Sequence, residues 1–358
     1  MTLLFRQRRS LVFWSLVSFL SILLTLFFGS VIQLHRAYLK MPKDPLVGDN
    51  PATLAALKNG GLPFSFLVMG DSSLNQTAQT LIRKASRQGD ASFLVIVGDF
   101  VTEPDLWYHR WFLMEMTQDI QPAFPVFLAP GNHDIDWRSL IRKAERRVTP
   151  EVYDSLYGAR NFSFVFNDCL FIICGIDLQN PASYLNYLEE TLSQKGVERK
   201  YIFVFAHHPP KDLANYIEGN LPMEDRFYSL LEAYKVTACF FGDYHGYWRG
   251  QRNGVNLIVS GGGGRLKASQ PEWGKFNHIL KMTVDPRGIS EGILILPEKG
   301  FDLGNSMEKW AFIYVLPLVE GGVGILYLFF FCSFSCGILS VIISLRLFLT
   351  KYRSNAPS

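Results

Sequence analysis

Cysteine is scarce in this sequence, and a concentrated block of positive charge is missing. The 358 residues include five cysteines, none in a Cys-x-x-Cys pair or a zinc-ribbon spacing, so the sequence excludes sites of those kinds. Cys169 and Cys174 lie at an odd offset in one strand-like stretch, which predicts that they point to opposite faces and cannot easily pair. The net charge is only +3, with basic residues scattered or flanking the apolar ends, so we expect no nucleic-acid partner.

A long apolar run lies near the N-terminus. No charged residue occurs from Leu11 to Leu34, which exceeds the roughly 20 residues that a membrane-spanning helix needs. A cleaved signal peptide is the alternative, but its apolar core would be only about 7–15 residues long and would end in small residues. The run therefore favours a transmembrane anchor over residues 11–34, preceded by a cytoplasmic N-terminus over residues 1–10.

A second apolar region lies near the C-terminus and is interrupted once. It begins near Trp310, breaks at residues 319–322 and resumes as far as Leu349. A short piece at the membrane surface followed by one spanning helix would give this pattern. The expected segments are an interfacial segment over residues 307–320, a transmembrane helix over 322–349 and a cytoplasmic tail over 350–358.

Basic residues beside the two apolar regions predict the orientation. Three arginines within residues 6–9 precede the first region, and Arg346, Lys351 and Arg353 flank the far end of the second. The positive-inside rule then predicts an integral membrane protein with both termini in the cytoplasm and the middle of the chain on the non-cytoplasmic side. Three basic residues within positions 36–43 weaken this bias.

The region between the apolar ends begins with a linker and continues as an alternating α/β pattern. Three prolines and a Gly-Gly pair within residues 35–61 predict the linker. Short apolar runs then end in Gly-Asp, Gly-Asn or His, and such continuous runs are typical of strands buried on both faces between helices. The runs are Phe64–Met69, Phe93–Val97, Val126–Ala129, Tyr201–Ala206 and Thr237–Phe241.

Side chains able to bind metal follow these apolar runs. Ligands of α/β sheets gather beyond the carboxyl ends of strands, and a preceding glycine lets the backbone turn tightly. A mixed set of carboxylate, amide and imidazole groups suits Mn, Fe or Zn. Two such ions about 3.5–4 Å apart could hold a phosphate ester and lower the pKa of a bridging water. The candidates are Asp71, Asp99, Asn132, His133, His207, Asp243 and His245.

The motifs that contain these residues occur in a characteristic order. They read GD, GD, GNHD, HHPP and GDYHGY, and the glycine-rich turn Ile258–Gly264 follows them. A single Gly-Asp is a weak signal, but this ordered set resembles the calcineurin-like metallophosphoesterase superfamily over roughly residues 63–285. The resemblance implies an α/β fold, a β-sandwich of two mixed sheets flanked by helices, and a metallophosphoesterase domain over residues 62–300.

The resemblance also implies which residues bind metal. Two divalent ions would share one bridging carboxylate, as in a dinuclear phosphoesterase centre. By position, the first ion would be held by Asp71 and His245, the bridge would be Asp99, and the second ion would be held by Asn132, His207 and Asp243.

The same resemblance implies catalytic and substrate-binding residues. His133 would stabilise the transition state or protonate the leaving group, with Asp99 as the other catalytic residue. His208 would contact the substrate or support a metal ligand. Tyr244 beside the last histidine motif could wall the pocket or pack into the core, and Arg249 could hold a phosphate oxygen or be an ordinary surface arginine.

Two positions depart from the pattern of the superfamily. Many members have a histidine two residues after the first aspartate, where this chain has Ser73, so the first metal would lose a nitrogen ligand. Asp243 stands in place of the first histidine of the last motif. Because the remaining set is richer in oxygen ligands, manganese is the favoured metal.

These observations predict a membrane-anchored, dinuclear-metal-dependent phosphoester hydrolase. Asp-Arg-Gly is missing after Asp99, and Asp134 replaces a glutamate, so the phosphoprotein-phosphatase branch is disfavoured and a phosphodiesterase slightly preferred over a phosphomonoesterase. Placement at a lipid bilayer suggests lipid-linked or envelope phosphoesters as substrates. The alternative, supported by Ser73 and Asp243, is a catalytically impaired relative that serves as a membrane scaffold or sensor.

Overall fold

The computed structural model describes residues 2–177, 179–211, 213, 221–267, 274–296 and 302–354. The chain divides into two compact units. A helical unit comprises residues 1–40 and 303–358, and an α/β unit comprises residues 41–302.

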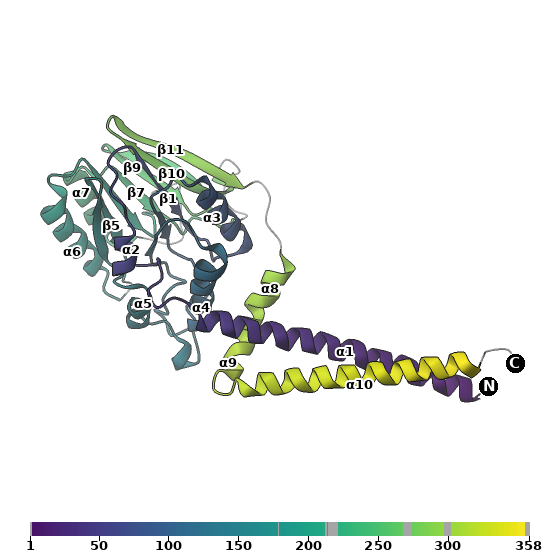
Figure 1. Ribbon diagram of the computed structural model, residues 1–358. Coiled ribbons are helices and arrows are strands. Elements are labelled where there is room, and N and C mark those ends of the chain that lie inside the picture. The colour runs from purple at the N-terminus through teal and green to yellow at the C-terminus, as the bar shows by residue number, and fades with distance from the viewer. Residues whose placement is uncertain are drawn as a thin grey trace. The chain divides into compact units, whose positions relative to one another are not determined.

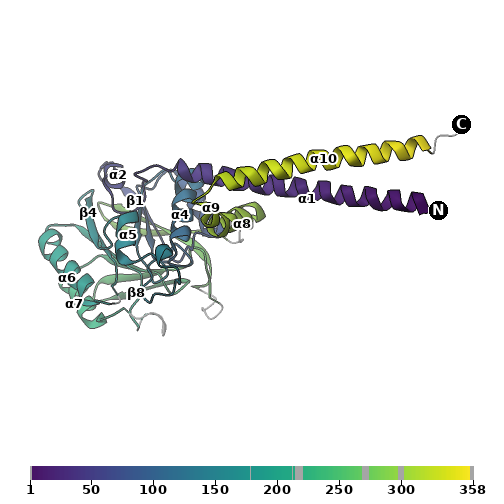
Figure 2. The ribbon, with the colours of Figure 1, turned by 90° about the horizontal axis from the view of Figure 1, so that it is seen from below.

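Two long helices form the core of the helical unit. Helices α1 and α10 run side by side in opposite directions, so that the start of α1 and the end of α10 lie at the same end of the pair (Figures 1 and 2). Shorter helical pieces precede α10. The elements are α1 (Thr2–Leu39), α8 (Leu303–Trp310), a π-helical turn (Ala311–Val315), α9 (Leu316–Val319) and α10 (Gly324–Ser354).

The pair α1 and α10 packs through apolar surfaces with two buried or half-buried hydroxyl contacts. The Ser18 hydroxyl donates to Ser340 Oγ at 2.9 Å, and the Thr25 hydroxyl donates to Ser333 Oγ at 3.1 Å. Hydroxyl contacts of this kind join helices in lipid, where unpaired polar groups are costly. Segments Arg9–Leu39 and Gly324–Thr350 are long and apolar enough to cross a membrane.

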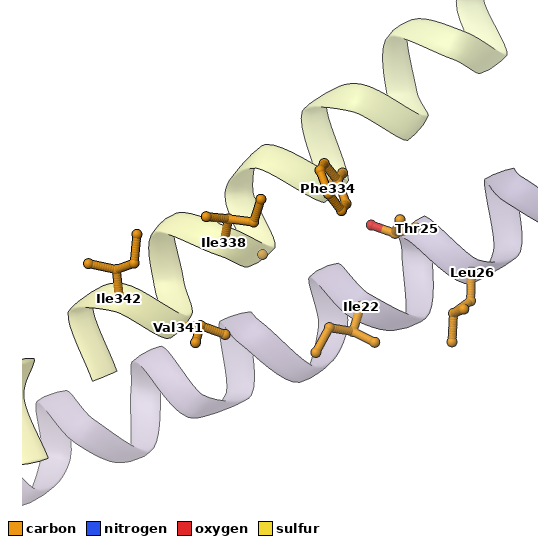
Figure 3. A pocket seen from close by; sticks show the side chains of 8 residues that line it. Ile22, Thr25, Leu26, Phe334, Ile338, Val341 and Ile342 are labelled. Atoms are coloured by element: carbon orange, nitrogen blue, oxygen red, sulfur yellow. The ribbon is translucent and has the colours of Figure 1, made fainter. Parts of the chain in front are cut away.

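An apolar cavity of about 360 Å³ lies between α1 and α10 (Figure 3). Ile22 and Leu26 line it from α1, and Phe334 and Ile338 line it from α10. The hydroxyl of Thr25 in its wall is already bonded to the opposite helix. The lining therefore suits hydrocarbon rather than a polar ligand.

The α/β unit is built on two mixed sheets. Its strands are β1 (Phe64–Met69), β2 (Leu94–Val97), β3 (Val126–Ala129), β4 (Phe162–Phe166), β5 (Cys169–Cys174), β6 (Tyr201–Ala206), β7 (Ala238–Phe241), β8 (Tyr247–Arg252), β9 (Val255–Ser260), β10 (Asn277–Asp285) and β11 (Gly288–Leu296). One sheet has the order β11-β10-β1-β2-β3, and the other has the order β4-β5-β6-β7-β9-β8. The strands β1, β2 and β3 are parallel, as are β5, β6, β7 and β9.

Aromatic side chains fill the space between the two sheets. On β1, Phe64, Phe66 and Val68 belong to this inner core, while Leu67 and Met69 belong to the cluster on the outer face. This division follows the two-residue period of a strand. Phenylalanines of both sheets surround Phe66 at ring-centroid distances of 5.0 to 6.5 Å. The sandwich is thus held together mainly by interlocking phenyl rings.

Helices cover the outer face of each sheet, as Figure 1 shows for α3 and α4 on one side and α6 and α7 on the other. The helices are α2 (Pro51–Ala55), α3 (Gln76–Gln88), α4 (Leu106–Met114), α5 (Pro150–Tyr157), α6 (Ala182–Thr191) and α7 (Glu224–Ala233), with π-helical turns at Glu115–Ile120 and Leu192–Gly196 and a 3₁₀ turn at Ala144–Arg146. The predicted α/β class with two mixed sheets flanked by helices is confirmed. Cys169 lies in the inner core and Cys174 in the outer cluster, on opposite faces of β5 as expected.

Candidate metal centre

The carboxyl ends of parallel strands from both sheets meet at one edge of the sandwich. The Asp71 N–H, after β1, donates to the Gly98 carbonyl after β2 at 3.0 Å. In the other sheet, the Gly242 N–H after β7 donates to the His207 carbonyl after β6 at 2.9 Å. The two sheets are joined where His207 Nδ1 lies 2.9 Å from the carbonyl oxygen of Val97, the last residue of β2. Residues that are far apart in sequence therefore share one small region.

Four predicted ligands have a left-handed backbone conformation. The φ angle is 54° at Asp71, 52° at Asp99, 60° at Asp243 and 53° at His245. Aspartate and histidine tolerate this region better than most residues, but it still costs of order 1 kcal/mol or more at each position. Such strain concentrates at functional sites, where the surrounding structure holds the backbone in place.

The glycines before the ligands are needed for close approach more than for the turn itself. Of the four that precede Asp71, Asp99, Asn132 and Asp243, only Gly98 has a positive φ, so the tight turn belongs mainly to the aspartates. A Cβ on Gly98 would lie 2.1 Å from His207 Nδ1. The prediction that each of these glycines provides the tight turn is therefore wrong. Glycine is still required, because an added Cβ would collide with neighbouring atoms.

The first ligand cluster consists of Asp71, Asp99 and His245, whose ligand atoms all lie within 4.8 Å of one another. His245 Nε2 is 3.3 Å from Asp71 Oδ1, and no donor in the described part of the chain bonds to this buried oxygen. Burial raises the pKa of Asp71 well above its usual range, and the charges of Asp99 and Asp243 raise it further. Burial, helped by the charge of Lys267, lowers the pKa of His245 to about 4.

A carboxyl oxygen and an imidazole nitrogen thus lie 3.3 Å apart in a place where burial disfavours the charged form of each group. A cation bound between them would favour the ionised carboxylate and use the imidazole lone pair. Ser73, the first departure from the superfamily pattern, is buried beside the cluster, and its N–H donates to the Asp99 carbonyl at 2.8 Å. Its backbone thus holds it next to Asp99, the predicted bridge.

The second ligand cluster is centred on His207. Because His207 Nδ1 is used on the Val97 carbonyl, its Nε2 is the ring nitrogen directed toward the other ligands. That nitrogen lies 3.1 Å from Asn132 Oδ1, 3.4 Å from Asp99 Oδ1 and 3.8 Å from Asp243 Oδ1. Three oxygens thus converge on one buried imidazole nitrogen, an arrangement that would suit a divalent cation once that nitrogen is unprotonated.

His208, predicted to contact the substrate or to support a metal ligand, lies beside Asp243. Its Nδ1 is 3.4 Å from Asp243 Oδ2, and it forms a second ligand group with His207 and Asp243. Burial would raise the pKa of Asp243, but the bond from His208 and the charges of His207 and Lys267 hold it below its usual range. Asp243, the second departure from the pattern, is thus an ionised carboxylate supported by a histidine.

The residues present fit a pair of divalent cations. Two clusters share Asp99, and each contains a carboxylate and an imidazole. An uncompensated group of buried carboxylates, with an oxygen that bonds to no donor among the described residues, is stabilised when cations are bound. The structure brings together all six predicted metal ligands: Asp71, Asp99, Asn132, His207, Asp243 and His245.

His133, the predicted catalytic histidine, lies at the rim of the centre. Its N–H donates to Asp99 Oδ1 at 3.0 Å, and its Nδ1 is 2.9 Å from the Thr102 carbonyl oxygen. Its Nε2 is then directed to the centre, 4.0 Å from Asp99 Oδ2, and the side chain is 45% exposed. A substrate could therefore reach this nitrogen from solvent.

The structure does not bring Tyr244 or Arg249 to the metal ligands. Tyr244 is buried within the hydrophobic cluster on the outer face of the second sheet. Arg249 lies on β8, where its Nε is 3.3 Å from Glu291 Oε2. Of the two readings that the sequence left open for each residue, this geometry favours packing for Tyr244 and a surface arginine for Arg249, whose side chain is 52% exposed.

Asp134 has a role that the sequence analysis did not foresee. Its fully buried carboxylate accepts the N–H groups of Asp99 at 2.8 Å, Val101 at 3.2 Å and Gly131 at 2.7 Å. It thereby fixes the loop after β2 to the loop after β3. Burial raises the pKa of Asp134 well above its usual range, and the charge of Asp99 adds to this. Its position directly after Gly-Asn-His was the feature of the sequence that could have predicted this role.

Lys267 is the second residue that the sequence analysis missed. The loop that carries it passes over Asp71, since the Arg265 N–H is 3.3 Å from the Asp71 carbonyl oxygen. A Cβ on Gly261 would lie 2.6 Å from Asp71 Oδ2, which shows how closely this loop approaches. The charge of Lys267 helps to lower the pKa of Asp243 and His245. For Asp71 it only partly offsets the rise in pKa that burial causes. Its only signal in the sequence was the glycine-rich turn before it.

The chain is similar to a known protein family. A family model described as calcineurin-like phosphoesterase matches residues 64–247, slightly more than half of the 358 residues. No curated protein matches the chain.

Several solved structures are similar to this chain at low sequence identity. Purple acid phosphatase PPD1 from yellow lupin (Lupinus luteus) seeds has a TM-score of 0.51 and 16% identity over 68% of this chain and 53% of its own, so this chain spans about half the length of the lupin enzyme. GAP50, the anchor in the inner membrane complex of Plasmodium, has a TM-score of 0.49 and 15% identity over 70% and 95%. A dimetal phosphatase from Danio rerio has a TM-score of 0.42 and 13% identity over 65% and 98%.

Proposed function

This chain belongs to the calcineurin-like phosphoesterase family, and from that premise we propose that it is a dinuclear-metal-dependent hydrolase of phosphate esters anchored to a membrane. The observation that carries the hydrolase proposal is the pair of ligand clusters that share Asp99 at one edge of the sandwich. A chain that had lost the activity would have little reason to keep buried, mutually repelling carboxylates and imidazole lone pairs together.

The residues divide naturally between two ions. Asp71 and His245 would hold one, with Asp99 as the bridge. The other would be held by Asn132, His207 and Asp243. When bound, such a pair supplies a bridging water of lowered pKa and neutralises charge on the phosphoryl oxygens. Because oxygen ligands outnumber nitrogen ligands, we favour manganese.

His133 is placed to move a proton to the leaving group. Its Nδ1 is held by the Thr102 carbonyl, so Nε2 is the atom that faces the substrate. When Nε2 is protonated, it can donate to the ester oxygen as the bond to phosphorus breaks. His208 supports Asp243, and the charge of Lys267 near the same carboxylates would attract an anionic phosphoester.

The two apolar helices support membrane anchoring. We propose that residues 11–34 and 322–349 cross the bilayer, that residues 307–320 lie at its surface, and that the domain of residues 62–300 is on the non-cytoplasmic side. An active centre tethered in this way would meet lipid-linked or envelope phosphoesters. A phosphodiesterase is slightly preferred over a phosphomonoesterase.

One assay tests the hydrolase proposal. Full-length protein purified in detergent would be stripped of metal, supplied with Mn, Fe or Zn, and given an aryl phosphomonoester or an aryl phosphodiester. We expect turnover with at least one metal, fastest with Mn, and loss of on the order of 10²-fold or more in Asp99→Asn, because even groups outside the metal shell cost that much. Turnover no higher than in Asp99→Asn under every metal would contradict the proposal and favour a membrane scaffold.

A further inference from the structure

A surface loop near the metal centre combines exposed cations with an exposed leucine. Residues 138–143, between β3 and α5, read Arg-Ser-Leu-Ile-Arg-Lys. Leu140 is 69% exposed, and Arg138, Arg142 and Lys143 are exposed beside it. In the part of the chain that the structure describes, none of these three cations pairs with a carboxylate. The loop thus presents positive charge around an apolar tip.

The base of the 138–143 loop is held by hydrogen bonds and ion pairs. The Arg146 side chain donates to both carboxylate oxygens of Asp105, at 2.6 and 2.9 Å. The N–H groups of Leu140 and Ile141 donate to the Asp136 carboxylate at 2.7 and 3.1 Å. The backbone conformation of the tip is therefore set by the fold, and the three cations of the tip are accessible to a partner beside one exposed acidic residue, Glu145.

The connection from α1 is attached to the same two elements as the loop. Beyond α1, the Gly48 N–H donates to the Val126 carbonyl of β3 at 2.8 Å, and the Asp49 N–H donates to the Tyr157 carbonyl of α5 at 2.6 Å. Eight residues lie between Leu39, the end of α1, and Gly48, and they extend at most about 29 Å. A bilayer that contains α1 therefore lies within a short tether of the β3–α5 region.

We propose that the 138–143 loop is an interaction surface for anionic lipid headgroups, a role that rests on the membrane anchoring proposed above. Arginine and lysine side chains are attracted to an anionic bilayer surface, and an exposed leucine between them can enter the interface. The loop follows the motif that contains His133. Docking would therefore hold the metal centre at the level of the headgroups, where a membrane phosphoester is presented.

Hydrogen exchange of the full-length protein in lipid nanodiscs tests this surface. One set of discs contains phosphatidylcholine alone, and the other contains phosphatidylcholine with phosphatidylglycerol. We expect the amides of residues 138–143 to exchange several-fold more slowly in the anionic discs. Reversing the loop charges (Arg138→Glu, Arg142→Glu, Lys143→Glu) should abolish that difference, and Leu140→Ser should reduce it.

A matched control reverses three exposed cations that lie on other elements, Lys84→Glu, Arg87→Glu and Arg287→Glu. This control should keep the lipid-dependent protection, and slow exchange in β5 and β6 shows that each variant is folded. Equal exchange of the loop in both kinds of disc, or protection that survives the loop variant, would overturn the proposed surface. Failure of the unaltered protein to enter either disc would instead overturn the anchoring, and this inference with it.

Discussion

The interior of the sandwich and the edge where its strands end are made by the same strands but follow opposite rules. Between the sheets, Phe66 is fully buried among phenyl rings and contributes through packing alone. At the edge, Asp71 is equally buried but has an oxygen that no donor among the described residues satisfies. The interior stabilises the fold, whereas the edge costs stability in a way that bound cations would offset. Substitutions should therefore affect stability in one region and metal binding in the other.

The largest effect on stability is expected from Phe66→Ala. Removal of this ring leaves a cavity in the inner core and should lower the free energy of unfolding by about 3–5 kcal/mol. Chemical denaturation of the full-length protein measures the change, with Phe66→Leu as a milder control. The remaining folded molecules should bind manganese as the unaltered chain does. If Phe66→Ala lost manganese binding but kept its stability, the proposed difference between the interior and the edge would be wrong.

At the edge, Asp71→Asn should instead increase the stability of the metal-free protein. The raised pKa of Asp71 means that the metal-free folded state binds a proton more tightly than the unfolded state, so stability falls as pH rises above the carboxyl's ordinary pKa. Asparagine removes this penalty. In chelator at pH 7, we expect Asp71→Asn to unfold at a higher temperature than the unaltered protein.

Manganese should reverse that order. At a hundredfold excess over Kd, it should stabilise the unaltered protein by about 2.7 kcal/mol for each ion bound and the Asp71→Asn variant by much less. Thermal unfolding with chelator and with manganese gives both values. If Asp71→Asn were less stable than the unaltered chain in chelator, the Asp71 carboxylate would not destabilise the metal-free fold.

Asp134→Asn should separate positioning from bulk stability. An amide keeps the shape of this side chain but weakens its acceptance of the three N–H groups that hold the Asp99 and Gly131 loops together. We expect kcat/KM to fall about 10–100-fold, as for other groups that orient metal ligands. Asp136→Asn is the matched control, because its carboxylate also accepts backbone N–H groups but away from the ligands. An equal loss in both variants would argue against a specific role for Asp134.

The smallest expected effect concerns acid stability and His278. Burial lowers the pKa of His278 to about 4, so the folded state keeps it neutral while the unfolded state protonates it near pH 6.5. Its contribution to stability is therefore present above that pH and is lost as pH falls toward 4. Between pH 7.5 and 5.5 the loss should be about 1.4 kcal/mol. Urea unfolding at the two pH values should show that the free energy of unfolding depends less on pH in His278→Gln than in the unaltered protein. An unchanged pH dependence would exclude His278 as the source of the acid-induced loss of stability.

The apolar runs and the ligand motifs were predictable because both depend on local sequence. A buried strand must be continuously apolar, and a ligand at its end must be a particular residue type directly after it. The strands that end before Asp71, Asp99 and His207 therefore lie where the pattern predicts. Cys169 and Cys174 follow the same two-residue period.

The remaining features depend on contacts between distant segments. Nothing near Arg249 in the sequence indicates that Glu291 of β11 will pair with it. The approach of the Lys267 loop to Asp71 depends on where β9 ends in the second sheet. The sequence left open whether His208 contacts the substrate or supports a metal ligand, and the fold places Asp243 beside it. Such partners are set by the topology of the two sheets, which residue types and spacing do not specify.

The most direct test of the account is the metal content and coupling of the full-length protein. Electron paramagnetic resonance of the manganese-loaded protein, combined with elemental analysis, reports both the number of ions and whether they share a ligand. We predict two ions per chain with the signal of a coupled pair, and loss of the coupling in Asp99→Asn. Isolated manganese only, or no manganese retained by the unaltered protein, would contradict the shared centre.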